Sequence, residues 1–112
     1  MNIQRGDIYM AQLGEQPNGS IQAGYRPVLI CSNNLNNRYS QIYNFIPLTS
    51  RRKKDLPVHV CLHNCGLHIK ETTALVEQIS VINKSQLGRK VGRINRICEE
   101  KIKKAIMIQL DL

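Results

Sequence analysis

Short apolar segments separated by turn-forming residues are the feature that most restricts how this 112-residue chain can fold. Each segment is rich in Ile, Val, Leu, Tyr or Thr, whereas Gly, Pro, Asn and Ser are concentrated between the segments. Strand-like segments at such close spacing are typical of a small β-barrel or β-sandwich. We therefore expect five or six strands, within the ranges 7–13, 27–33, 41–49, 58–63, 72–80 and 81–83.

The connections between these segments are predicted to be loops and turns. Residues 14–25 are rich in Gly, Pro, Asn and Ser, which predicts a long mobile loop. Residues 33–40 are polar, and we interpret them as a turn. Residues 50–57 form a basic segment that ends at a proline, and they are expected to be a loop.

The last part of the chain has a helical period. Its apolar residues recur mainly at every fourth position and are Ile94, Ile97, Cys98, Ile102, Ala105, Ile106 and Leu110. This pattern predicts one amphipathic helix, with Asn95 as its N-cap and acidic residues near its positive end. We expect the helix to close one end of the barrel, so that residues 1–112 form a single domain, mainly β with a C-terminal helix.

The charge of the chain indicates what kind of partner it has. Lys and Arg number 16 against 8 Asp and Glu, which gives a formal net charge of +8. Such an excess favours nucleic acid, an acidic protein or an anionic surface as the partner. With aromatic residues at only 4% and no tryptophan, an aromatic base-stacking platform is disfavoured.

Nothing in the sequence predicts a membrane-spanning segment or a secretory signal. The four cysteines are therefore expected to be reduced thiols in a cytoplasmic protein.

Histidine and cysteine are clustered within ten positions, at His59, Cys61, His63, Cys65 and His68. Structural zinc sites usually combine two separated ligand pairs, and this chain has no second pair. A catalytic cysteine–histidine pair would also need a group that orients the base, and none is evident. We interpret the cluster as an ordinary strand and turn and expect no metal.

Arg26 and Thr49 are the strongest candidates for a functional site. Pro27 keeps Arg26 extended at the start of the second predicted strand, and Thr49 ends the third. If these strands are neighbours, the guanidinium and the hydroxyl face one pocket, where the planar fork of arginine suits two phosphate oxygens. The basic residues that follow, at 51–54, would form a positive wall along a nucleic-acid backbone.

The chain resembles the MazF/PemK family of toxin endoribonucleases from bacterial type II toxin–antitoxin systems. The resemblance rests on "RGDIY", "GSIQAGYRPVLI", "IPLTS", "LPVHV", "TALVEQISVI" and "IQLDL", which occur in the family's order along essentially the whole chain. It implies a small SH3-like barrel of the MazF/PemK/CcdB type and a homodimer. It also implies metal-independent cleavage of single-stranded RNA without a cofactor.

The same resemblance assigns roles to individual residues. It gives Arg26 and Thr49 the catalytic role, and it suggests RNA contacts at Ser20, Gln22, Gly24, Ser50, Arg51 and Gln78. The implied reaction is attack of a ribose 2′-hydroxyl on the adjacent phosphate, which leaves a 2′,3′-cyclic phosphate and a 5′-hydroxyl. The implied partner is an antitoxin with an acidic C-terminal segment. The family often has an acidic residue where this chain has Ile21, so base preference stays open.

Two other functions are compatible with the sequence. One is a non-catalytic basic β-barrel that binds nucleic acid or an acidic protein. The other is a toxin of the same fold that poisons DNA gyrase, which does not require the arginine and threonine together. Detection of metal-independent RNA cleavage separates both from a nuclease.

Overall fold

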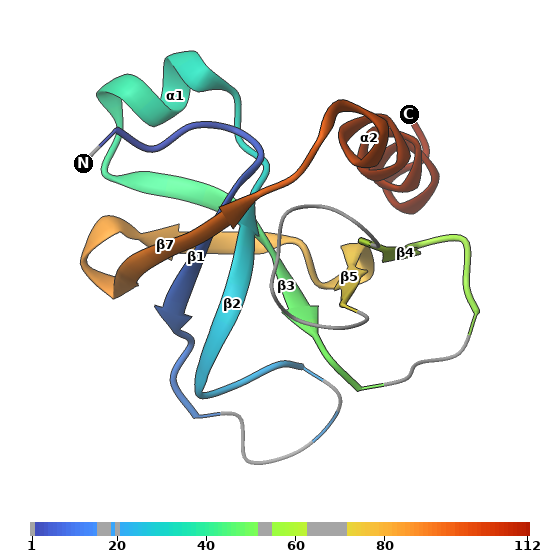
Figure 1. The fold of residues 1–112 in the computed structure, drawn as a ribbon, viewed down its shortest axis with the longest axis horizontal. Helices are drawn as coiled ribbons and strands as arrows, with labels where there is room; N and C mark the ends of the chain where they lie inside the picture. Colours follow the sequence, from blue (N-terminus) through green and yellow to red (C-terminus); the bar gives the residue numbers. More distant parts are fainter. Residues whose placement is uncertain (1, 16–18, 20, 52–54, 63–71) are drawn as a thin grey trace.

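The computed structural model describes residues 2–15, 19, 21–51, 55–62 and 72–112. Within these residues, seven strands form one curved antiparallel sheet, and a long helix follows them (Figure 1). The strands are β1 (Asp7–Gln12), β2 (Tyr25–Ile30), β3 (Ile42–Thr49), β4 (His59–Cys61), β5 (Thr73–Leu75), β6 (Ser80–Asn83) and β7 (Leu87–Arg93). The helices are α1 (Asn34–Tyr39) and α2 (Arg96–Leu110), with the single 3₁₀ turns η1 (Val76–Gln78) and η2 (Lys84–Gln86).

The strand β3 is central to the sheet and pairs with three other strands. The strand order is β4-β5-β3-β2-β1-β7, and β6 also pairs with β3. The first half of β3 pairs with β6, its middle with β2 and its end with β5. The sheet is thus curled but not closed, and the predicted mainly-β, barrel-like fold with a C-terminal helix is confirmed.

Alternating side chains of the central strands fill two cores. Leu29 and Ile46 face α2, in a core that includes Cys98, Ile102 and Ala105. The opposite face packs a second core, which contains Tyr9, Val28, Ile30, Phe45 and Ile82. Figure 1 shows α2 beside β4 and β5, at the other end of the molecule from the start of β2. Arg26, near the start of β2, therefore lies away from the helix.

The predicted C-terminal helix is confirmed, including its cap, because the Oδ1 of Asn95 accepts the Cys98 N–H at 2.9 Å. Two residues of the predicted apolar stripe are instead exposed, Ile97 by 69% and Leu110 by 50%. A residue at every fourth position advances about 40° beyond one full turn, so the stripe winds away from the core towards Leu110. The expectation of four reduced thiols is wrong for Cys98, which is disulfide-bonded on the buried side of α2.

Two local predictions are wrong, and one strand was not predicted at all. The polar segment 33–40 contains α1, because the Oδ1 of Asn33 caps the helix by accepting the Asn36 N–H at 2.8 Å. The predicted strand 72–80 is interrupted by η1, so that β6 begins only at Ser80. The strand β7 was not expected, because its glycines and exposed basic residues hide any alternating pattern.

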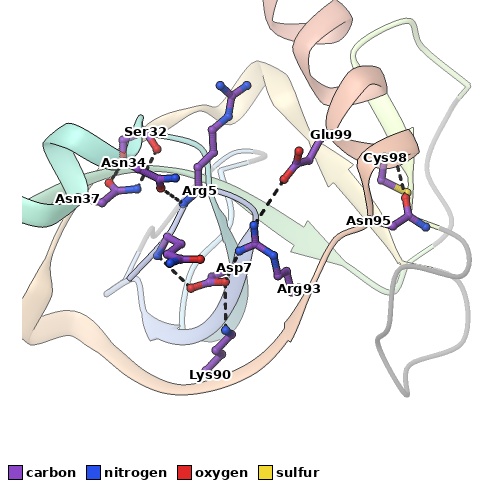
Figure 2. A network of polar contacts seen from close by, with 11 residues as sticks. Arg5, Asp7, Ser32, Asn34, Asn37, Lys90, Arg93, Asn95, Cys98 and Glu99 are labelled. Carbon is purple, nitrogen blue, oxygen red and sulfur yellow. Dashed lines mark hydrogen bonds and ion pairs between the residues drawn. The ribbon is translucent and has the colours of Figure 1, made fainter. Parts of the chain in front are cut away.

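A buried carboxylate joins β1, β7 and α2 (Figure 2). Asp7 has no exposed surface, and its Oδ1 lies 2.8 Å from Nη1 of Arg93 and 3.1 Å from Nζ of Lys90. Its Oδ2 accepts the backbone N–H of Gln4 at 2.9 Å. Nη2 of Arg93 also lies 3.9 Å from Oε1 of Glu99, in the first turn of α2. The network thus fixes β7 to β1 and the start of the helix to both.

No helix in the described part of the chain combines the length and the apolar character needed to cross a membrane.

Candidate functional site

Arg26 is the second residue of β2, where it pairs with Ala11 of β1. The strand begins at Tyr25, two residues earlier than expected, so Arg26 lies in the strand and not before it. Pro27 is therefore internal to the strand and is not its first residue, contrary to the predicted range 27–33. Pairing with β3 starts only at Val28, which is consistent with a Pro27 that has no N–H to donate.

The register between β2 and β3 relates Arg26 to Thr49. The last pair at this end of the ladder is Val28 with Pro47. Continuing an antiparallel register by two residues sets Arg26 across from Thr49, and alternation gives both the face of Val28 and Pro47. The two residues thus come from neighbouring strands at the end where the ladder stops, which is the condition that a shared pocket requires.

Arg26 and Thr49 each keep hydrogen-bond donors that their contacts with the described residues do not use. Arg26 is half-buried, and its Nε donates to the carbonyl of Ala23 at 3.1 Å. Its two Nη groups make no hydrogen bond to any residue that the structure describes. Thr49 is buried, and its Oγ1 accepts the Arg51 N–H at 3.2 Å. Since a hydroxyl can both accept and donate, the hydroxyl hydrogen of Thr49 remains available.

A cavity of about 210 Å³ lies on the same face of the sheet. Its wall includes Phe45 and Pro47 of β3, Ser80 of β6, and two of the predicted RNA contacts, Gln22 and Gln78. The backbone N–H of Gln22 donates to Oε1 of Gln78 at 2.8 Å. Residues separated by 56 positions are thereby brought together. No pattern in the sequence predicts that apolar residues such as Phe45 and Pro47 line this cavity.

Gly24 has a backbone role at the base of the loop between β1 and β2. Its φ of +78° is left-handed, a conformation that glycine adopts without the cost that a Cβ brings. Its carbonyl accepts the Leu13 N–H and its N–H donates to the carbonyl of Gly14, each at 2.8 Å. Gly24 thus closes the loop whose residues Ile21 and Gln22 line the cavity.

The remaining predicted contacts are placed as follows. Ser50 and Arg51 directly follow Thr49 and are exposed, in agreement with a surface accessible to a chain-like ligand. Ser20 lies outside the described residues, as do Arg52, Lys53 and Lys54 of the basic segment.

The histidine and cysteine cluster is described only in part. His59 Nε2 contacts Oε2 of Glu77, a partner that the sequence did not indicate. Cys61 is an exposed free thiol. No group of three or more potential metal ligands occurs among the described residues. His63, Cys65 and His68 fall outside them.

Comparison with known proteins gives consistent similarities. A family model described as PemK-like, MazF-like toxin of type II toxin–antitoxin system matches residues 4–110. Endoribonuclease EndoA of Bacillus subtilis is 34% identical over 115 residues, which cover 100% of this chain and 97% of that protein. Endoribonuclease MazF of Staphylococcus saprophyticus is 33% identical, with 98% and 92% covered.

Solved structures share the fold. A mycobacterial endoribonuclease in complex with its cognate antitoxin superimposes with a TM-score of 0.83 and 26% identity, over 98% of this chain and 96% of that one. MazF from Deinococcus radiodurans also gives a TM-score of 0.83, at 19% identity over 100% and 99% of the two chains.

Proposed function

The chain belongs to the family of PemK-like and MazF-like toxins of type II toxin–antitoxin systems, and we propose that its endoribonuclease activity resides where β2 and β3 separate. The observation that carries this proposal is the register, which sets Arg26 and Thr49 across from each other beside the cavity of Gln22 and Gln78. The substrate is single-stranded RNA, whose backbone enters the junction while a base occupies the cavity.

The chemistry is transesterification within the RNA. The ribose 2′-oxygen bonds to the adjacent phosphorus as it loses its proton to solvent water, and the bond to the 5′-oxygen breaks. The 5′-oxygen leaves with a proton from solvent, so the products are a 2′,3′-cyclic phosphate and a 5′-hydroxyl. DNA lacks the nucleophile and is not cleaved.

Arg26 and Thr49 act on the charge that develops on the phosphorane oxygens. The Nε bond to Ala23 holds the guanidinium, so that its Nη groups act as a fixed fork for the phosphate. Thr49 supplies a second donor. Preorganised donors of this kind need no reorganisation in the transition state, and loss of one costs about 3 kcal/mol. Arginine stays protonated near neutral pH, so Arg26 stabilises charge and does not serve as the general base.

The surface around the junction also supports the choice of partners. Ser50 and Arg51 extend it for the RNA backbone, and Gly24 borders its entrance. Ser20 is proposed as a further RNA contact. An antitoxin with an acidic C-terminal segment is proposed to occupy the same groove and block Arg26. A similar mycobacterial endoribonuclease was solved in complex with its cognate antitoxin, which supports an antitoxin as the partner. We further propose a homodimer that works in the cytoplasm without metal or cofactor.

Both alternatives that the sequence left open are less well supported. The relatives that cover nearly the whole chain are named endoribonucleases, which favours a nuclease over a non-catalytic binding protein or a gyrase poison.

The test is incubation of the purified protein with single-stranded RNA in EDTA, followed by analysis of the fragment ends. We expect cleavage that leaves 5′-hydroxyl and cyclic phosphate ends, and intact RNA with Arg26→Ala. RNA that carries one 2′-deoxyribose before the cleaved bond should resist. Intact RNA with the natural protein, or cleavage that requires a metal, contradicts the proposal.

A further inference from the structure

We propose that His59 and Glu77 form a positioning pair that fixes Gln78 and, through it, the loop residue Gln22 for RNA capture. This inference rests on the proposed function. It gives a role to the one described histidine, which the proposed chemistry does not use. His59 lies on β4 and Glu77 on η1, so the pair joins two elements that flank the site.

The contact between the two side chains is largely shielded from solvent. The side chain of His59 is 10% exposed and that of Glu77 30%. Oε2 of Glu77 contacts Nε2 of His59, whereas Oε1 is buried and has no hydrogen-bond partner in the described part of the chain. Among the described residues, His59 is the contact that holds this carboxylate, so it fixes where the Glu77 side chain lies.

Two backbone hydrogen bonds in the described part of the chain hold η1. It is a single turn of three residues without a side-chain cap. The Val76 N–H donates to the carbonyl of Val58 at 3.0 Å, and the Ile79 N–H closes the turn on Val76 at 3.1 Å. Val76 is fully buried and anchors the turn in the core. The side chains of Glu77 and Gln78 connect this turn to β4 and to the loop.

Glu77 and Gln78 connect the pair to the cavity. Successive residues of a 3₁₀ turn leave it about 120° apart, so one side chain reaches β4 while the next reaches the loop. Oε1 of Gln78 accepts the Gln22 N–H at 2.8 Å, and both glutamines line the cavity. A displaced Glu77 moves Gln78 and releases Gln22.

His59 does not line the cavity, and it follows the β3 junction by ten positions on a different strand. We therefore expect the pair to affect substrate capture more than chemistry. For His59→Ala, KM for a single-stranded RNA should rise about tenfold while kcat changes less than about threefold, the pattern of lost uniform binding. Gln78→Ala should likewise raise KM with little change in kcat. The double variant His59→Ala/Gln78→Ala should raise KM no more than either single variant does.

Glu99→Gln is the matched control. The side chain of Glu99 is 34% exposed and also faces a cation, Arg93 at 3.9 Å, but it lies on α2 away from the loop. Its replacement should leave kcat and KM unchanged. Equal KM values for His59→Ala and the natural protein, or a fall in kcat alone, overturn the proposal. If His59→Ala does not fold, Glu77→Gln, which keeps the shape of the side chain, replaces it in every assay.

A second measurement does not depend on cleavage. Hydrogen exchange of the Gln22 amide in protein without RNA should accelerate about tenfold in His59→Ala, as its bond to Gln78 opens, and should be unchanged in Glu99→Gln. Unaltered exchange contradicts the positioning role even if RNA is cleaved. Faster exchange in a protein that cleaves no RNA supports the contact chain and rejects the proposed function.

Discussion

Arg26 combines two properties that rarely occur together in a half-buried arginine. Its backbone is extended before Pro27 and paired with β1, and its Nε is bound to Ala23. Its terminal nitrogens are nevertheless unpaired among the described residues. Much of the side-chain entropy that a phosphate contact would cost is therefore already lost in the free protein. A short side chain, Thr49, can then complete the site.

The first prediction separates the geometry of Arg26 from its charge. Arg26→Lys keeps the charge but removes the planar fork and the Nε bond to Ala23. We expect the single-turnover cleavage rate to fall by about a hundredfold, corresponding to the loss of one oriented donor. Arg89→Lys, at an exposed position on β7, is the control and should cleave normally. Full activity of Arg26→Lys would show that charge alone is sufficient.

The second prediction concerns Cys31, the residue after β2. Burial raises the pKa of its thiol from 9.0 to about 12, against a smaller lowering by Arg5. Because the thiolate is the reactive form, iodoacetamide at pH 8 should modify the exposed Cys61 and spare Cys31. Mass spectrometry of the alkylated peptides measures this. Rapid modification of Cys31 in the folded protein contradicts the expectation.

The same pKa shift of Cys31 makes stability depend on pH in the alkaline range. Below pH 9 the thiol is protonated in both states and contributes no slope. Between pH 9 and 12 the unfolded chain loses this proton first, so the free energy of unfolding falls by up to about 1.4 kcal/mol per pH unit. Burial also raises the pKa of Tyr9, so the comparison must be with Cys31→Ala, whose slope should be smaller.

At the level of elements, the sequence predicted the strands that bury side chains and missed those held by pairing. β1, β2 and β3 contain runs of apolar residues, and these runs identify them as buried strands from the sequence alone. β7 reads LGRKVGR, and its position follows from its pairing with β1 and from the ion pairs of Asp7. Contacts between residues far apart in the sequence produce no periodic pattern of apolar residues within the strand itself. For the same reason, the break at η1 could not be read from an apolar segment.

The third prediction tests whether Asp7 holds β7 in the fold. Asp7→Asn preserves size but removes the charge that binds Arg93 and Lys90. Both cations are almost half exposed and can return to water, so we expect a loss of about 2 kcal/mol, measured by urea unfolding. Asp111→Asn, at an exposed position, should change little. An unaltered unfolding midpoint for Asp7→Asn would mean that the ion pairs are not needed.

For the whole molecule, composition predicted a class of partner, and the strand topology determines the shape of the candidate site. The charge of +8 indicated a polyanion, and the order of the first three strands brought Arg26 and Thr49 together. The cavity was not foreseeable, because its walls come from the loop before β2, from β3 and from η1 and β6. The shape of the cavity depends on how β6 pairs with β3. This pairing cannot be predicted from any single segment of the sequence.

The final prediction follows from the charge of the whole surface. If RNA lies along the junction and the basic residues beyond it, binding releases counterions, and log K should fall linearly with log salt concentration. For single strands the slope is about −0.7 per phosphate neutralised, so contacts to about four phosphates give about −3. Arg51→Gln should make the slope shallower by about 0.7, whereas Lys101→Gln on the exposed side of α2 should leave it unchanged.

The measurement uses RNA with 2′-O-methyl groups, which binds but lacks the nucleophile, so affinity is separated from cleavage. Titrations between about 50 and 200 mM salt span the range in which such slopes are resolved. A flat response would mean that the positive charge is not directed at the RNA. Equal effects of Arg51→Gln and Lys101→Gln would mean that binding uses the net charge of the protein and not the path that begins at Thr49.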